Sequence, residues 1–135
     1  MGIDDISDDH AKMVREYFQT VSKDSTVLDA GCGGGKGCIT KILHDLKFDN
    51  IDGVDFLRGL DITHMYRNVY FNDLYTFDFD HYDIIIACDI TYIHLCDPIS
   101  RVRRLLKRLQ RKSNCLVTVL DYKRHLEKDW CISKA

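Results

Sequence analysis

A glycine-rich stretch at residues 29–35 is the part of the chain whose residue types and spacing point most directly to chemistry. It reads DAGCGGG and follows a short apolar run that is typical of a buried strand. Glycine lets the backbone turn tightly and brings its N–H groups close to a bound molecule. A helical apolar pattern follows from Ile39 to Leu46, and a helix start adds unpaired donors and partial positive charge. The stretch predicts a strand–loop–helix that holds a polar, nucleotide-like ligand.

The spacing of these glycines excludes two phosphate-binding motifs. In the dinucleotide pattern G-x-G-x-x-G/A, the last position falls on Lys36, Cys38 or Thr40 in the successive registers. The P-loop pattern also fails, because Ala30 and Gly37 occupy required positions on either side of the Gly-Lys pair. What remains is D-x-G-x-G-x-G, and a glycine-rich turn without a ligand is the alternative interpretation.

The D-x-G-x-G-x-G pattern resembles motif I of the class I S-adenosylmethionine-dependent methyltransferases. The resemblance implies that Asp29 orients the glycine loop and the methionine end of the cofactor. It also implies that the loop residues line the cofactor; these are Gly31, Cys32, Gly33 and Gly35. S-adenosylmethionine is therefore the expected cofactor, and no metal is expected.

Acidic residues after two further predicted strands fit the same resemblance. Asp55 lies 24 positions after Gly31, where a carboxylate can accept both hydroxyl hydrogens of a ribose, and Phe56 follows it. Asp73 and Leu74 match the family position that binds the adenine amino group and covers the ring. A turn aspartate is the alternative interpretation of both acids. Cys88, at the end of the fourth predicted strand, completes the expected cofactor contacts.

The segment after that strand carries the candidate catalytic residues. Its D-x-x-Y sequence, Asp89 to Tyr92, resembles the seven-strand protein-lysine methyltransferases, although similar segments occur in enzymes acting on small molecules. A general base is needed only if the acceptor must lose a proton. Asp89, Tyr92 and His94 are the candidates, and a structural role is the alternative for each.

The elements that position these residues alternate between helix and strand. Four helices are expected. The first covers residues 9–21, the second runs from the glycine loop to residue 46, and the last covers residues 122–130. The third begins with Asp97 as the N-cap and Pro98 as the first helical residue. Strands are expected at residues 26–30, 51–56, 69–71, 82–88 and 115–120. This alternation predicts one α/β domain over residues 1–135, a doubly wound, mainly parallel sheet of Rossmann-like methyltransferase type. Two strands usual in the family are expected to be missing, and Asp83 is expected to be structural.

The composition narrows the class of protein. The 135 residues are 45% hydrophobic and 30% charged, with a net charge of −2, and no apolar run is long enough to cross a bilayer. The Asp-rich N-terminus is unlike a signal peptide, and six cysteines without a C-x-x-C pair favour reduced thiols and a cytoplasmic location. Seven basic residues between positions 101 and 112 are interpreted as a solvated helix face, which argues against nucleic acid. The acidic loop at residues 78–83 is likewise interpreted as solvated.

Three functions stay open from the sequence alone. The first is an active methyltransferase on an N or O acceptor, either a protein lysine or a small molecule. The second is a catalytically inactive subunit of the same fold that supports a partner, and the third is a regulator that binds the cofactor without turnover. A fifth strand at the edge of the sheet would expose unpaired backbone groups, and it would favour a homodimer or another partner there.

Overall fold

Strands and helices alternate along most of the chain. The computed structural model describes residues 8–31, 38–55, 63–87, 98–121 and 128–134. The helices are α1 (Asp8–Gln19), α2 (Cys38–Asp45), the 3-10 turn η1 (Thr63–Met65) and α4 (Ile99–Arg111). The strands are β1 (Val27–Ala30), β2 (Ile51–Asp55), β3 (Asn68–Phe71), β4 (Tyr82–Ala87), β5 (Ser113–Asp121) and β6 (Lys128–Lys134).

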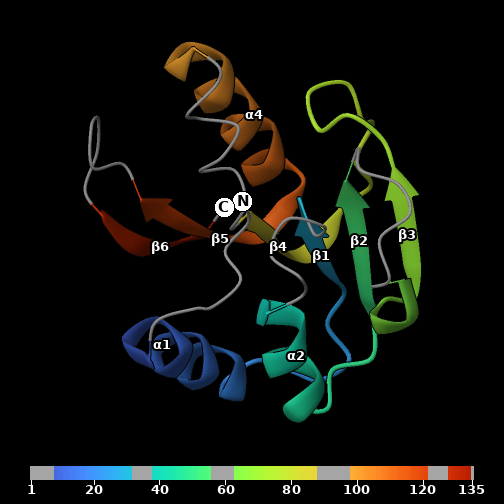
Figure 1. The fold of residues 1–135 in the computed structure, drawn as a ribbon, viewed down its shortest axis with the longest axis vertical. Coiled ribbons are helices and arrows are strands. Elements are labelled where there is room, and N and C mark those ends of the chain that lie inside the picture. The colour runs from blue at the N-terminus through green and yellow to red at the C-terminus, as the bar shows by residue number, and fades with distance from the viewer. Residues whose placement is uncertain (1–7, 32–37, 56–62, 88–97, 122–127, 135) are drawn as a thin grey trace.

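The strands form one sheet in the order β3-β2-β1-β4-β5-β6 (Figure 1). The pairs among β1 to β5 are all parallel. The chain runs outward from β1 to β3 and then returns to the other side of β1, so the strand order reverses between β1 and β4. Ligands of open α/β sheets bind beyond the carboxyl ends of the strands at such a reversal. The predicted doubly wound parallel sheet is confirmed.

The C-terminal strand corrects two expectations. β6 pairs antiparallel with β5 from Cys115 opposite Lys134 to Asp121 opposite Lys128. The expected helix at residues 122–130 is therefore wrong at 128–130, while residues 122–127 lie outside the described ones. The expected edge at the fifth strand is also wrong, because β6 satisfies the backbone groups that would otherwise be unpaired. The argument for a dimer or partner at that edge falls with it.

The start of α4 differs by one residue from the prediction. Pro98 is the N-cap, with φ −58° and ψ 137°, and Ile99 is the first helical residue. The extended ψ keeps Pro98 outside the helix, while its carbonyl accepts hydrogen bonds from the N–H groups of Arg101 and Val102 at 3.0 and 3.3 Å. The proposed N-cap, Asp97, lies outside the described residues.

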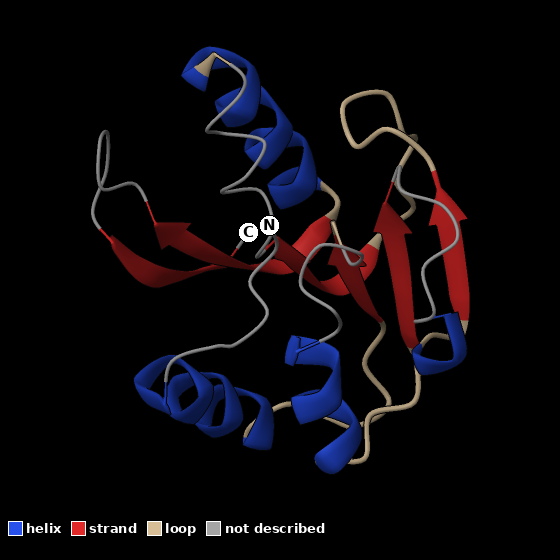
Figure 2. Cartoon of the chain, in the orientation of Figure 1, coloured by secondary structure: helices blue, strands red, loops and turns tan. Residues whose placement is uncertain are grey.

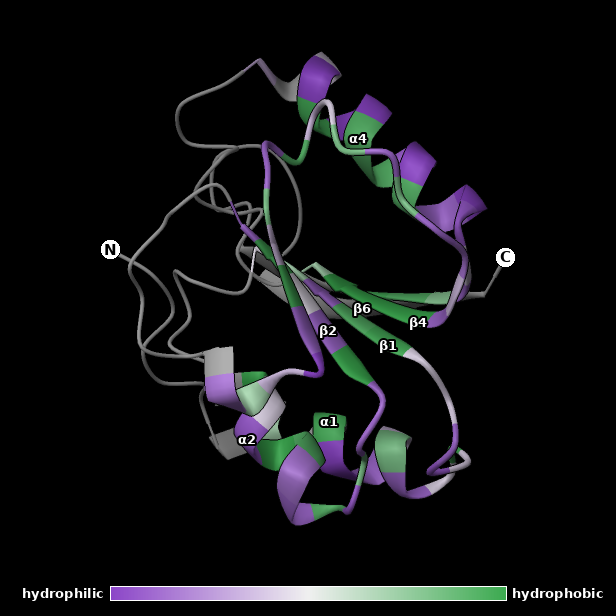
Figure 3. Ribbon diagram, turned by 90° about the vertical axis from the view of Figure 1, so that its right-hand side faces the viewer, coloured by the Kyte–Doolittle hydropathy of each residue, from purple (hydrophilic) through white to green (hydrophobic). Residues whose placement is uncertain are grey.

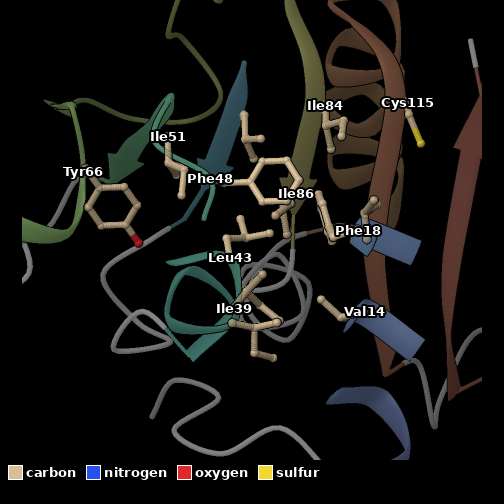
Figure 4. Close-up of a cluster of buried hydrophobic side chains, with 13 residues drawn as sticks. Val14, Phe18, Ile39, Leu43, Phe48, Ile51, Tyr66, Ile84, Ile86 and Cys115 are labelled. Atoms are coloured by element: carbon tan, nitrogen blue, oxygen red, sulfur yellow. The ribbon is translucent and has the colours of Figure 1, made fainter. Parts of the chain in front are cut away.

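Helices cover both faces of the sheet, α1 and α2 on one side and α4 on the other (Figures 2 and 3). Alternate strand residues enter separate cores: Ile84 and Ile86 pack toward α1 and α2, and Ile85 packs toward α4. The core between the sheet and helices α1 and α2 is called the first core, and Figure 4 shows it. In it the fully buried rings of Phe18 and Phe48 meet edge to face, with their centres 5.5 Å apart. Each described helix is too short or too polar to span a lipid bilayer.

The amino ends of the strands are joined by two aspartates. Asp83, which the sequence predicted to be structural, accepts hydrogen bonds from the Thr26 backbone N–H at 2.9 Å and from the Asn114 amide at 3.3 Å. Asp52 is buried and accepts two hydrogen bonds at 3.0 Å from the Arg67 guanidinium and one at 2.7 Å from the Tyr82 hydroxyl. This end of the sheet is structural, which leaves the carboxyl ends for a site.

Candidate functional site

The site begins where β1 and β2 end side by side. Asp29 is in register with Gly53, so Asp55 lies two residues further along the neighbouring strand. Gly31 has a φ of 83°, which favours glycine, and its N–H donates to the Val54 carbonyl at 2.7 Å. The alternation along the strands places both aspartates on the α2 face. The first glycine of the predicted loop therefore turns beside two acidic side chains.

Asp29 is held on one of its two carboxylate oxygens. The Tyr66 hydroxyl donates to Oδ2 at 2.8 Å, and the Thr40 hydroxyl lies 3.1 Å from the same oxygen and 3.1 Å from the Tyr66 oxygen. Asp29 is 2% exposed and Thr40 is fully buried. Oδ1 of Asp29 is buried and has no hydrogen-bond partner among the described residues. The carboxylate therefore keeps one oxygen that a further donor can satisfy.

The electrostatics of Asp29 follow from this position. Burial raises the pKa of its carboxyl to about 6, against the hydrogen bonds from Tyr66 and Thr40, which lower it. The nearby Asp55 carboxylate raises it further. No ion pair of the described residues includes Asp29. At neutral pH the site thus concentrates negative charge in a buried place, which favours a ligand that donates hydrogen bonds or carries positive charge.

Asp55 connects this end of β2 to the turn after β3. Its side chain is buried, and its backbone carbonyl accepts a hydrogen bond from the Asn72 N–H at 2.9 Å. That bond fixes the start of the turn that carries Asp73. The register of β2 and β3 therefore places Asp55, the predicted ribose acid, and Asp73, the predicted adenine acid, side by side at the carboxyl ends of the strands.

Asp73 and Leu74 differ in exposure. Asp73 is exposed, and its Oδ1 accepts a hydrogen bond from the Tyr75 N–H at 2.9 Å, while its carbonyl accepts one from Phe77 at 2.9 Å. It thus shapes the turn, as the alternative interpretation of the sequence expected. Leu74 is 3% exposed and packs in the core under α4. That Asp73 binds the adenine amino group and that Leu74 covers the adenine ring stay predictions.

A residue of α4 holds this turn in place. The Arg108 guanidinium donates hydrogen bonds at 2.6 Å to the carbonyls of Tyr75 and Phe77, and the Arg101 guanidinium lies 3.8 Å from the centre of the Tyr75 ring. The basic residues of α4 are otherwise exposed on its outer face, as the sequence predicted (Figure 3). Two of the seven therefore position the turn next to Asp55.

The remaining predicted site residues lie outside the described ones. These are Cys32, Gly33, Gly35, Phe56, Cys88, Asp89, Tyr92 and His94. Sequence reasoning missed Tyr66 and Thr40. Thr40 had a signal, since it is a polar residue within the apolar pattern of a helix, whereas Tyr66 sits in an irregular segment without a pattern. Within the described ranges, no three His, Cys, Asp or Glu side chains gather as metal ligands would.

Comparison with solved structures gives the fold an independent reference. A magnesium protoporphyrin IX methyltransferase from Synechocystis PCC 6803 superposes with a TM-score of 0.64 at 17% identity over 89% of this chain. CalS10, an amino pentose methyltransferase from Micromonospora echinaspora, gives 0.64 at 17% over 88%. KedS8, a sugar N-methyltransferase from Streptoalloteichus sp ATCC 53650, gives 0.62 at 18% over 87%.

The match covers only part of each solved protein. The chain spans 62% of the first structure, 53% of the second and 50% of the third. No family model and no curated protein matches the sequence. At these identities the likeness concerns architecture, and it agrees with the strand order and the reversal between β1 and β4. The chain therefore has the Rossmann-like fold of the class I S-adenosylmethionine-dependent methyltransferases.

Proposed function

We propose that this protein is a methyltransferase that uses S-adenosylmethionine to methylate an N or O acceptor. The observation that carries the proposal is the pair of buried carboxylates, Asp29 and Asp55, beside the Gly31 turn where β1 and β2 end. Two structural neighbours support it, since both of those proteins were solved with S-adenosylmethionine bound.

Each described residue of the site has a separate task in this proposal. Asp55 accepts hydrogen bonds from the ribose hydroxyls, and Asp29 faces the methionine portion with its positive charge. The turn from Asp73 to Leu74 lies along the adenine. The glycine turn admits the cofactor close to the backbone. These contacts bind and orient the cofactor, and orientation contributes much of the acceleration in a displacement of this kind.

The chemistry of transfer is a direct displacement. When bound, the cofactor supplies an activated methyl group on a sulfonium. An acceptor lone pair would form the new bond to that carbon as the carbon–sulfur bond breaks, and S-adenosylhomocysteine would be the leaving product. A neutral acceptor then loses a proton to a base or to water, and Asp89, Tyr92 and His94 stay the candidates for that base.

Two classes of N or O acceptor fit our proposal, a protein lysine and a small molecule. The D-x-x-Y segment supports a protein lysine. The structural neighbours support a small molecule, since those proteins are methyltransferases of a porphyrin, an amino pentose and a sugar. Both acceptors are nucleophiles that need no cofactor other than S-adenosylmethionine.

Calorimetric titration with S-adenosylmethionine and S-adenosylhomocysteine tests the binding. The wild type is expected to bind both, and Asp55→Asn to bind about 10-fold or more weakly, because a carboxylate bond to a ligand hydroxyl is lost. Asp83→Asn is the matched control, since it neutralises an aspartate at the opposite end of the sheet. Absence of binding to the wild type would refute the proposal, as would an equal loss in both variants.

Turnover needs a second experiment. Labelled S-adenosylmethionine is incubated with the wild type and a cell extract, and the labelled material is separated by size. Label in protein supports a lysine acceptor, and label in small molecules supports the other class. Binding without any labelled acceptor at saturating enzyme would instead support a cofactor-binding protein without turnover.

A further inference from the structure

Tyr66 reaches the site from a segment that the cofactor contacts of the proposed function do not include. It follows η1 directly, and its ring lies beside Ile51 at the margin of the first core (Figure 4). The segment is fixed on both sides of the tyrosine. His44 Nε2 lies 2.6 Å from the Met65 carbonyl, and the Arg67 N–H donates to the Ile51 carbonyl at 2.7 Å. The tyrosine ring is therefore held while its hydroxyl reaches Asp29.

The hydrogen bonds at Asp29 are divided unequally between its two oxygens. Oδ2 receives the Tyr66 hydroxyl at 2.8 Å and lies 3.1 Å from the Thr40 hydroxyl. Oδ1 is buried without a partner among the described residues. An unsatisfied buried oxygen is costly, so one in a native structure calls for an explanation, and a donor on a bound ligand supplies one here. The arrangement fixes the plane of the carboxylate and leaves one oxygen for a ligand.

We propose that Tyr66 is a positioning residue for the cofactor: its hydroxyl holds the Asp29 carboxylate so that Oδ1 accepts a hydrogen bond from the positively charged methionine portion. This inference rests on the proposed function. The hydroxyl of Tyr66 is within hydrogen-bond distance of Asp29 and Thr40. Its effect is exerted through Asp29, which must be ionised to attract a cation.

The groups around Asp29 determine how its ionisation responds to the loss of Tyr66. Thr40 faces it from α2, Tyr66 from the segment after η1, and the Asp55 carboxylate from β2. Tyr66 and Thr40 favour the ionised form by hydrogen bonding, whereas Asp55 disfavours it by repulsion. Removing the Tyr66 hydroxyl deletes the shortest hydrogen bond to the carboxylate. Protonation of Asp29, and with it the loss of cofactor binding, then moves to higher pH.

Tyr82 provides a matched control at the other end of the sheet. Its hydroxyl donates to the buried carboxylate of Asp52 at 2.7 Å, and its ring is buried to a similar degree as that of Tyr66. Tyr82→Phe therefore removes the same kind of tyrosine–aspartate hydrogen bond on the opposite face of the sheet from Asp29 and Tyr66. A purely structural effect of losing such a bond appears in both variants, whereas an effect on the cofactor appears in one.

The experiment is calorimetric titration of the full chain with S-adenosylmethionine between pH 5 and pH 8.5. Wild-type affinity is expected to fall as the pH decreases through about 6. In Tyr66→Phe this midpoint should rise by about one pH unit, so the affinity should be about 5-fold weaker near pH 6, almost 10-fold weaker near pH 5, and close to that of the wild type at pH 8.5. The titration of the cofactor's own amino group is common to all variants and cancels in the comparison. Tyr82→Phe should keep the wild-type midpoint.

Three results overturn the inference. One is an unmoved midpoint in Tyr66→Phe, another is a loss of affinity that is the same at every pH, and the third is an equal shift in Tyr82→Phe. A wild type that binds no S-adenosylmethionine at any pH overturns the proposed function as well, so the two failures are distinguishable. If Tyr66→Phe does not fold, Thr40→Ala removes the other hydroxyl beside Oδ2, and an upward midpoint shift is expected there too.

Discussion

Neutralising Asp29 is expected to stabilise the ligand-free protein while it weakens cofactor binding. Burial and the Asp55 charge raise the pKa of Asp29 from 3.8 to about 6, so the folded state disfavours its charge. A raised pKa contributes stability that is fully present below the unfolded-state value and is lost as the pH rises through about 6. Asp29→Asn has no carboxyl to ionise as the pH rises, so its stability relative to the wild type should increase with pH.

The size of the Asp29 pKa shift determines how much the free energy of unfolding changes. A difference of about two pKa units, at about 1.4 kcal/mol per unit, corresponds to about 3 kcal/mol in the free energy of unfolding above pH 7. The asparagine also places an amide N–H where Oδ1 has no partner, which costs about 1–3 kcal/mol at every pH. Because that cost is independent of pH, the change between pH 4.5 and pH 7.5 isolates the titration of Asp29.

Urea unfolding of both proteins without ligand, followed at a series of pH values, measures this change. We expect the variant to gain about 2 kcal/mol relative to the wild type between pH 4.5 and pH 7.5, because part of the full effect is already present at pH 4.5. Titration with S-adenosylmethionine should show that the variant binds more weakly than the wild type at pH 7.5. The Asp29 side chain would then lower stability and support binding, which is a stability–function trade-off. A stability difference that stays constant with pH would refute the electrostatic reasoning.

Three further predictions concern the framework around the site. Arg67→Met leaves the Asp52 carboxylate buried without its ion pair and should lower the free energy of unfolding by about 1–3 kcal/mol in a urea titration, less than for a fully buried pair because the arginine is 44% exposed. Arg108→Lys keeps the charge but loses the planar fork that bonds the Tyr75 and Phe77 carbonyls, so hydrogen exchange at the Phe77 N–H should accelerate severalfold while that of β1 does not. Phe18→Ala empties a fully buried position and should destabilise by about 3–5 kcal/mol in the same urea titration, and a loss below 1 kcal/mol would contradict the described packing.

The parallel strands could be predicted because their signals are local. The apolar run of β4 from Tyr82 to Ala87 fills both cores, and such a run is recognisable from the sequence alone. The aspartates at strand ends followed from the same reading, since the place of Asp29 and Asp55 depends only on where their strands stop. The confirmed role of Asp83 rested on the same logic, because it starts a strand and faces the opposite end.

Other features depend on contacts between distant residues. β6 was missed although Trp130 and Ile132 alternate with more polar neighbours, because its identity depends on pairing with β5. Tyr66 carries no periodic signal, and its position beside Asp29 results from the packing of an irregular segment 37 residues further along the chain. Pairing and packing of this kind are decided by the whole fold.

The two hydrogen bonds that Arg108 donates also constrain the order in which the molecule can assemble. The carbonyls of the turn between β3 and β4 accept hydrogen bonds from a helix residue more than 30 positions later in the chain. During synthesis these carbonyls therefore stay hydrogen-bonded to water until α4 has been made and has packed against the sheet. This turn at the carboxyl end of β3 should accordingly become ordered late, after β3 has paired with β2 and β4 with β1.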